Sequence, residues 1–180
     1  MNTLDALFSR KSVRTYTGEQ ITAEKLEVIL KSAYAAPIGM GKYEDMHLTV
    51  IQNPKLLDRI DAAAAAMFGD RSRHPLYNAP TLIVVSSRAP EAGNIMMENL
   101  AFSNAAIVVH NMALAATEMG LGACYIWGAT AAVLQNQDLI AELNLPEKFV
   151  PCCAVSLGKT DEVYSVREIP ADRITKNVIL

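Results

Sequence analysis

The chain has 180 residues, a length that fits one compact domain, so we expect a single domain over residues 1–180. The net charge of −3 and the pI of about 5.6 argue against a nucleic-acid partner, because nucleic-acid-binding surfaces usually carry a basic patch. Hydrophobic residues make up 51% of the chain and charged residues only 19%, which favours an oligomer that buries additional apolar surface.

The sequence shows no feature typical of export or membrane insertion. The first ten residues lack the charged start and the long apolar run of a secretory signal. The longest apolar stretch, residues 100–119, is interrupted by polar residues such as His110 and Glu118, so we expect a buried helix without a membrane span. The three cysteines give no disulfide framework. These features predict a cytoplasmic protein.

Apolar periodicity and helix caps predict five helices. Thr22 and Asn53 are typical N-caps, and Pro37 is expected to end the helix that Thr22 begins. The expected helices cover approximately residues 4–10, 22–36, 53–67, 94–119 and 131–143. The helix over 94–119 is apolar on most sides, which places it at the centre of the molecule or in a dimer interface.

Short β-branched and apolar runs predict the extended segments. They cover residues 47–52, 81–85, 121–127 and 149–157. Helices mixed with about four strands favour a three-layer α+β domain over a doubly wound sheet. The tail, residues 173–180, alternates weakly and could add a further strand.

The basic cluster around Arg10, Lys11, Ser12 and Arg14 is the first candidate site. An arginine offers a fork of donors that matches the oxygens of a phosphate group. The ordinary alternative is a solvated positive surface at the C-terminal end of a helix, where cations are favourable in any case. Taken alone, the cluster slightly favours that alternative.

The glycine-rich segment from Gly120 to Gly128 is the second candidate site. Its glycines permit close approach of the backbone to a flat ligand, and Tyr125, Ile126 and Trp127 supply apolar surface. A flavin ring requires stacking area and hydrogen-bond donors at its reactive edge. Taken alone, the segment is equally typical of a helix C-cap followed by a core strand.

Other patterns of reactive residues do not form a recognisable site. The run Gly39–Lys42 lacks the leading glycine and the final Ser or Thr of a phosphate-binding loop. The cysteines and histidines lack the paired spacing of a zinc site. Cys152 and Cys153 are expected on opposite faces of a strand as core residues. A reactive thiol is not expected, and Cys124 is the one candidate, because it borders the glycine-rich segment.

The two candidate sites, at this separation and in this order, resemble the nitroreductase family. The residues that carry the resemblance are the Arg10-x-Ser12-x-Arg14 pattern, the stretches 24–37 and 111–122, the segment 125–128, and the stretch from Pro146 through Gly158 to Arg167. The resemblance implies a three-layer α-β-α sandwich of the α+β class, with a central, mostly antiparallel sheet flanked by helices. It also implies a homodimer with FMN bound between the subunits.

The resemblance further implies an enzyme that takes hydride from NADH or NADPH and reduces a nitroaromatic, a quinone or a similar small acceptor. The flavin performs this chemistry, so no catalytic residue of the chain itself is expected. The implied contacts to the FMN phosphate, ribityl chain and pyrimidine edge come from Arg10, Lys11, Ser12, Arg14 and Arg167. The implied contacts to the isoalloxazine ring come from Tyr125, Ile126, Trp127 and Gly128.

The chain departs from the family pattern in two places. Many members follow the Ala-Pro at 36–37 with a Ser-x-x-Asn-x-Gln-Pro-Trp segment, and residues 38–46 of this chain lack its Asn, Gln and Trp. Ser165 stands where some members carry a second basic residue. Two alternatives therefore stay open: an FMN-binding protein with little turnover, such as a carrier or sensor, or a member of the fold that binds another flat ligand.

Overall fold

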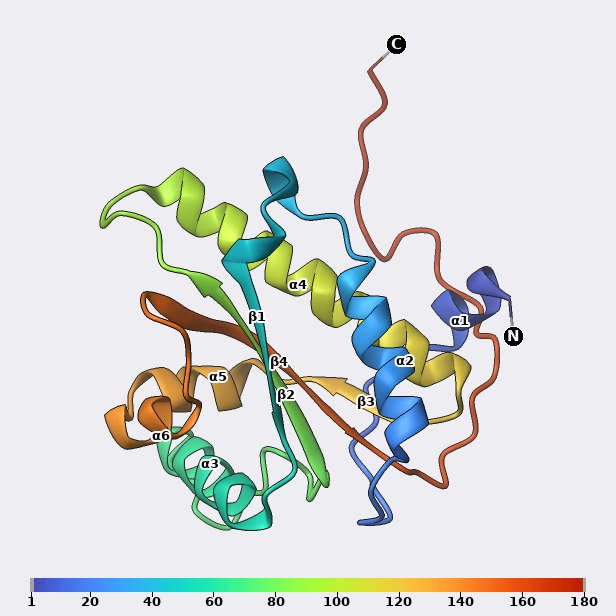
Figure 1. Ribbon diagram of the computed structural model, residues 1–180. Coiled ribbons are helices and arrows are strands. Elements are labelled where there is room, and N and C mark those ends of the chain that lie inside the picture. Colours follow the sequence, from blue (N-terminus) through green and yellow to red (C-terminus); the bar gives the residue numbers. More distant parts are fainter. Residues whose placement is uncertain (1, 180) are drawn as a thin grey trace.

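A computed structural model describes residues 2–179, so Leu180 of the expected terminal strand lies outside the described residues (Figure 1). A single antiparallel sheet has the strand order β1-β2-β4-β3. Its strands are β1 (Met46–Ile51), β2 (Thr81–Arg88), β3 (Gly122–Tyr125) and β4 (Phe149–Gly158). The helices are α1 (Thr3–Ser9), α2 (Ala23–Tyr34), α3 (Pro54–Met67), α4 (Ile95–Glu118), α5 (Trp127–Leu134) and α6 (Gln137–Glu142), with the 3₁₀ turns η1 (Gly39–Gly41) and η2 (Tyr43–Asp45).

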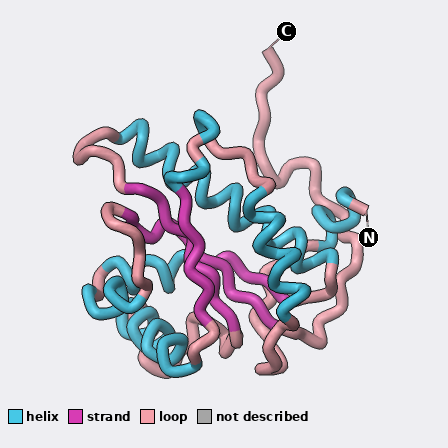
Figure 2. The backbone as a smooth tube through the Cα atoms, viewed as in Figure 1, coloured by secondary structure: helices cyan, strands magenta, loops and turns pink. Residues whose placement is uncertain are grey.

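Helices cover both faces of the sheet, as Figures 1 and 2 show. Alternate residues of β2 point to opposite faces: Ile83 and Val85 pack in the core formed with α2 and α4, whereas Leu82 and Val84 pack in the core formed with α3, α5 and α6. All four side chains are buried, because a strand covered on both faces must be apolar on both. The predicted three-layer α+β sandwich with an antiparallel sheet is therefore confirmed.

The predicted N-caps are also confirmed. The hydroxyl of Thr22 accepts a hydrogen bond from the Lys25 N–H, and the Asn53 side chain accepts one from the Leu56 N–H at 3.3 Å. Each cap satisfies one of the backbone donors that the first turn of a helix leaves without an internal partner.

The helix expected over residues 131–143 is wrong in its bounds. It is two helices, because Asn136 has an extended backbone and its side chain caps α6 through the N–H groups of Asp138 and Leu139. The first of them, α5, already begins at Trp127. Trp127 therefore lies in the first turn of a helix and not in the extended segment predicted for residues 121–127, and Gly128 follows it in the same turn.

The expected opposite orientation of Cys152 and Cys153 is also wrong. Both thiols lie in the core formed with α2 and α4, and both residues are buried. The reason is a shift of register between β2 and β4: Val85 pairs with Cys153, but the next residue of β2, Ser86, pairs with Pro151. The extra residue, Cys152, is thus a β-bulge that interrupts the alternation of side chains.

Helix α4 is long and apolar enough to cross a membrane by length and composition, yet it packs along the sheet beneath α2 (Figure 1). Its buried Asn104 accepts a hydrogen bond from the Gly39 N–H at 3.0 Å, which attaches η1 to the helix. The side of α4 that no other element covers is partly apolar, with Ile95, Met96 and Phe102 exposed. The predicted central position of this helix agrees with the structure.

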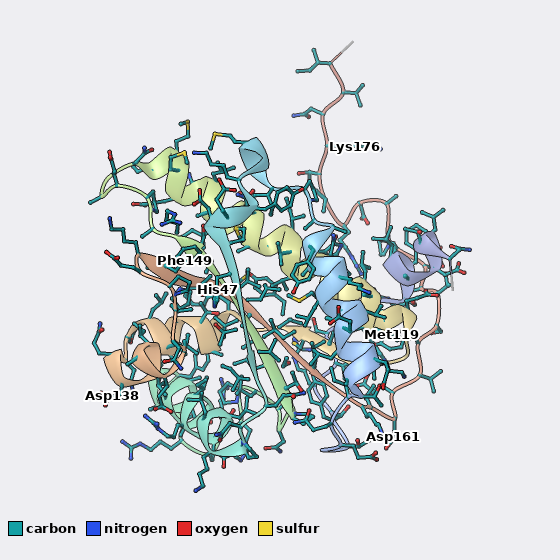
Figure 3. The ribbon with its side chains drawn as sticks, in the orientation of Figure 1. His47, Met119, Asp138, Phe149, Asp161 and Lys176 are labelled. Carbon is teal, nitrogen blue, oxygen red and sulfur yellow. The ribbon has the colours of Figure 1, made fainter. Side chains whose placement is uncertain are left out.

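After β4 the chain contains no further helix or strand within the described residues. Residues 159–167, which we call the C-terminal strap, run back across α1 and the basic cluster. Residues 168–179 then leave the domain, with Lys176 far out on this extended tail (Figure 3). The tail adds no strand to the sheet of its own chain. At the opposite end of the sheet, the rings of His47 and Phe149 stack edge to face at 6.0 Å where β1 and β4 begin (Figure 3).

Candidate functional site

The two candidate segments lie side by side in the structure. Helix α1 ends at Arg10, and the following residues run along β3, where the Val13 N–H donates to the Ala123 carbonyl at 3.0 Å. The side chain of Val13 is fully buried, and the Ser12 hydroxyl hydrogen-bonds the thiol of Cys124. The basic cluster is thereby fixed against the strand that leads into residues 125–128.

The guanidinium of Arg14 is exposed and lies over the ring of Tyr77 at 5.7 Å. A hydrogen bond to Tyr77 raises the pKa of Arg14, so this side chain is a permanent cation. Arg14 lines an open cavity of about 620 Å³. The other residues that line this cavity are Phe68, Arg73, His74, Pro75, Tyr77 and Asn78.

The segment 125–128 leaves the sheet beside this cavity. The Ile126 N–H donates to the Ala154 carbonyl at 2.8 Å, and α5 begins at the next residue. No side chain caps α5, so the N–H groups of its first turn, beginning with Trp127, have no partner within the helix. The side chains of Tyr125 and Trp127 are 46% and 60% exposed. Here an apolar surface adjoins donors that favour an electron-rich acceptor.

Phe68 connects this segment to the cavity. A methyl group at Gly128 would lie only 2.7 Å from Phe68 Cζ, so the ring packs directly on the backbone of α5 and requires a glycine there. The helix expected over residues 53–67 ends just before Phe68, so the sequence did not indicate that this ring packs on α5. The segment 69–77 is irregular and polar and holds three basic residues, but nothing in it indicates that it folds beside Arg14.

The backbone on this side of the cavity is strained. Tyr77 and Asn78 have φ values of 56° and 57°, the left-handed region that non-glycine residues rarely occupy. This conformation costs roughly 1–2 kcal/mol for a residue such as Tyr77, and less for Asn78. The Tyr77 N–H donates to the His74 carbonyl at 2.8 Å, which helps to hold the turn. Such strain clusters at functional sites, where surrounding contacts maintain it.

Arg10 and Arg167 come together at the end of α1. The Arg167 Nε donates to the Phe8 carbonyl at 3.0 Å, and the same guanidinium also donates to the Arg10 carbonyl. Arg10 itself lies near His110 of α4, whose pKa is lowered mainly by burial and secondarily by that nearby positive charge. Two of the predicted phosphate-binding arginines are thus adjacent, although Arg167 also serves as a C-terminal cap of α1.

Lys11 is already engaged by the C-terminal strap. Its ammonium lies 2.7 Å from the Glu162 carboxylate, donates to the Val163 carbonyl at 3.2 Å and sits over the Tyr164 ring at 5.6 Å. The hydrogen bonds from Lys11 and Thr15 lower the pKa of Glu162. Lys11 is therefore paired with a carboxylate, whereas the Arg167 guanidinium is held by two backbone carbonyls.

The three thiols lie in surroundings that disfavour their reactive form. Burial raises the pKa of Cys152 to about 11 and that of Cys153 to about 12. Burial also raises the pKa of Cys124, although Arg14 and Ser12 partly oppose this effect. Among the described residues there is no group of three or more His, Cys, Asp or Glu side chains arranged to hold a metal ion.

The fold and the site together define an α+β sandwich protein in which a basic cluster adjoins an uncapped helix start and an aromatic surface. The chain belongs to the nitroreductase family, whose model matches residues 7–159. The resemblance recognised in the sequence is thus confirmed.

Solved structures and a curated relative are similar to this chain over almost all of it. A nitroreductase with bound FMN from Bacteroides fragilis NCTC 9343 is 26% identical, with a TM-score of 0.81 over 99% of this chain and 100% of that chain. A nitroreductase with bound FMN from Desulfitobacterium hafniense DCB-2 is 25% identical, with a TM-score of 0.83 and the same coverage. The FMN reductase (NADPH) of Bacillus subtilis (strain 168) is 26% identical over 87% of this chain. The match spans 65% of the length of that reductase.

Proposed function

We propose that this protein is an FMN-dependent oxidoreductase that takes hydride from NAD(P)H and reduces a nitroaromatic, a quinone or a similar small acceptor. Family membership supports this function, as do the FMN bound to similar nitroreductases and the activity named for the B. subtilis relative. The observation that carries it is the Val13–Ala123 hydrogen bond, because it sets the basic cluster beside the uncapped start of α5.

The residues present suit the chemistry of FMN. Arg10, Arg14 and Arg167 would hold its phosphate and pyrimidine edge, since a doubly charged phosphate favours a cluster of arginine forks. Ser12 adds a hydroxyl for the ribityl chain. Lys11 could join them only by giving up Glu162. FMN, when bound, supplies the hydride chemistry.

The segment 125–128 would face the isoalloxazine ring. Tyr125, Ile126 and Trp127 offer apolar surface, although Ile126 is itself buried in the core and its N–H is bound to Ala154. The N–H groups at Trp127 and Gly128 remain for the electron-rich edge of the ring. These donors lie on a helix, so the site is rigid where it would meet the reactive part of the flavin.

We also propose a homodimer in the cytoplasm, with neither a nucleic-acid nor a membrane partner. Exposed apolar side chains on α1 and α4, among them Leu4, Phe8 and Phe102, would be covered in such a dimer. The tail, with Ile174 and Ile179 almost fully exposed, could cross to the partner. Burial of these surfaces in an isologous contact is the usual arrangement of a two-fold dimer.

The visible absorption spectrum of the purified protein, before and after addition of FMN and desalting, tests the cofactor. Flavin bands that survive desalting are expected. Anaerobic mixing with NADH and, separately, NADPH then tests turnover, because an oxidoreductase bleaches the flavin within seconds.

The loop after Pro37, which lacks the Asn, Gln and Trp of the family pattern, favours one alternative, a flavin-binding protein with little turnover. Such a protein would stay yellow with both nucleotides. A colourless protein that ignores added FMN would contradict both functions and would favour another flat ligand.

A further inference from the structure

A carboxylate and an imidazole form a fixed pair at the edge of the cavity that Arg14 lines. Asp61 of α3 accepts a hydrogen bond from the Leu76 N–H at 2.7 Å through Oδ1, and its Oδ2 lies 2.8 Å from His74 Nδ1. One oxygen is thus held by the backbone and the other by the imidazole. Because a carboxylate only accepts, Nδ1 of His74 carries the proton and donates it to Asp61.

This arrangement leaves the other ring nitrogen, Nε2, for the cavity. His74 lines the cavity together with Arg14 and Phe68, and its side chain is 63% exposed. The side chain of Asp61 is only 14% exposed, so the pair has a buried, fixed end and an accessible end. The strained residues Tyr77 and Asn78 begin two residues after Pro75, and the hydrogen bond from the Tyr77 N–H to the His74 carbonyl ties His74 to this turn.

The cavity adjoins the proposed flavin site at Arg14. Arg14 belongs to both, and Phe68 joins the cavity to the first turn of α5 through its contact with Gly128. A small acceptor that binds in this cavity would therefore lie beside the imidazole of His74, with the ring of Phe68 between it and the backbone of Gly128.

We propose that His74, positioned by Asp61, donates the proton that a nitro or quinone acceptor requires when it is reduced at this site. The inference rests on the proposed function. For a quinone, the transferred hydride forms an O–H bond with both electrons at one oxygen, and the imidazolium gives one proton to the other oxygen, which yields the hydroquinone. For a nitro group, the hydride and one proton from the imidazolium yield the nitroso compound and one molecule of water. His74 regains its proton from solvent.

The charges around His74 are mixed. Helix α3 contributes Asp61 and, one turn earlier, Asp58. The adjoining loop contributes Arg73 and its ion-pair partner Asp70. The basic cluster contributes Arg14. Asp61 is the negative group in direct contact with the ring, through the 2.8 Å distance from its Oδ2 to His74 Nδ1.

The experiment compares two acceptors with the flavin-loaded protein by stopped flow. Benzoquinone needs a proton with its hydride, whereas ferricyanide accepts single electrons and needs none. The variants are His74→Gln and Asp61→Asn, with Arg73→Gln as the control from the same cavity. Flavin content and the rate of bleaching by NAD(P)H are measured in every sample.

For His74→Gln we expect normal flavin content, normal bleaching and an unchanged ferricyanide rate, with a loss of about tenfold or more in the benzoquinone rate. Positioned proton donors contribute roughly 10²–10⁴-fold, and water can replace part of this in an open cavity. For Asp61→Asn we expect a smaller loss in the benzoquinone rate and an unchanged ferricyanide rate, because the ring loses the carboxylate that fixes its orientation. The Arg73→Gln variant should retain both rates.

Equal loss, or no loss, with the two acceptors in His74→Gln would overturn the proton-donor role while leaving the proposed function intact. Failure of the unmodified protein to bind flavin, or to bleach with either nucleotide, would overturn the proposed function and this inference with it. An unchanged benzoquinone rate in Asp61→Asn, or an equal loss with both acceptors, would contradict the positioning role of Asp61.

Discussion

The ring of Tyr16 occupies the space that a side chain at residue 122 would fill, since a methyl group at Gly122 would lie 2.9 Å from Tyr16 Cε1. The hydroxyl of Tyr16 is 2.9 Å from Ser156 Oγ and donates to the Val13 carbonyl at 3.1 Å. Gly122 pairs across the sheet with Gly158. A methyl group at Gly158 would also lie 2.9 Å from the Tyr16 ring, at its Cδ1 atom. Tyr16 therefore anchors the segment that carries Ser12 and Arg14 onto β3 and β4.

The first prediction concerns Gly122→Ala. The added methyl group would press on both Tyr16 and Val13, and such overpacking typically destabilises a core by about 1–3 kcal/mol. The displaced basic cluster should also bind FMN more weakly. Chemical denaturation and flavin titration measure the two effects. In the double variant with Tyr16→Ala the loss of stability should be less than the sum of the two single losses. Additive losses of stability in the double variant would show that the contact between residue 122 and the Tyr16 ring does not cause the destabilisation.

The second prediction concerns Arg14→Ala. The exposed guanidinium is fixed over Tyr77 and is the cation of the cluster that lies nearest to the cavity. Loss of one charged hydrogen bond costs about 1.5–3 kcal/mol, a ten- to hundredfold loss of affinity. The variant should therefore purify with much less flavin. Arg71→Ala, an exposed arginine of the loop after α3, serves as the control. Full flavin occupancy in Arg14→Ala would show that Arg14 does not contribute to flavin binding.

The third prediction concerns the ion pair of Lys11 with Glu162. Because the pKa of Glu162 is lowered in the folded protein, its ionised form stabilises the fold above the unfolded pKa near 4.5, and this contribution is lost as pH falls through the lower folded value. The pair is partly exposed, so we expect Glu162→Gln to cost no more than about 1 kcal/mol at pH 7 and almost nothing near pH 3.

Thermal unfolding of Glu162→Gln across this pH range measures the effect. Glu168→Gln, a change at an exposed carboxylate just beyond the strap, provides the comparison. If the loss of thermal stability in Glu162→Gln grew toward low pH, the ionised Glu162 would not be the form that stabilises the fold. The flavin affinity of the same variant shows in addition whether Lys11, once released, joins the phosphate ligands.

The long elements were predictable because their signals are local. The helix that became α4 and the strands around Ile83 and Val155 follow apolar patterns that burial on the sheet dictates. The break at Asn136 was missed because an asparagine inside an apolar helical pattern and an asparagine that caps a helix look alike in the sequence. The extended backbone at Asn136 distinguishes them. The bulge at Cys152 depends on the pairing of β4 with β2, which the residues of β4 alone do not encode.

The site was predictable only in part, for a related reason. Arg10, Ser12, Arg14 and the segment 125–128 form recognisable patterns within short windows. Phe68 and His74 enter the site because a loop 60 residues away in the chain folds beside Arg14, and no local pattern indicates that approach. The pairing of Lys11 with Glu162 likewise spans almost the whole chain. Tertiary contacts decide which of the basic residues remain available.

The last prediction concerns the tail beyond Arg167. Residues 168–179 lie away from their own domain, with Ile174 and Val178 exposed, so their removal should leave the thermal stability of the domain nearly unchanged. If the tail packs on a partner, the variant ending at Arg167 should dissociate at concentrations at which the full chain is dimeric, as light scattering measures. The full-length variant Ile174→Ser, Val178→Ser should weaken the dimer less than truncation does. Equal dimer dissociation constants for the full and truncated chains would place the interface elsewhere, on the exposed apolar sides of α1 and α4.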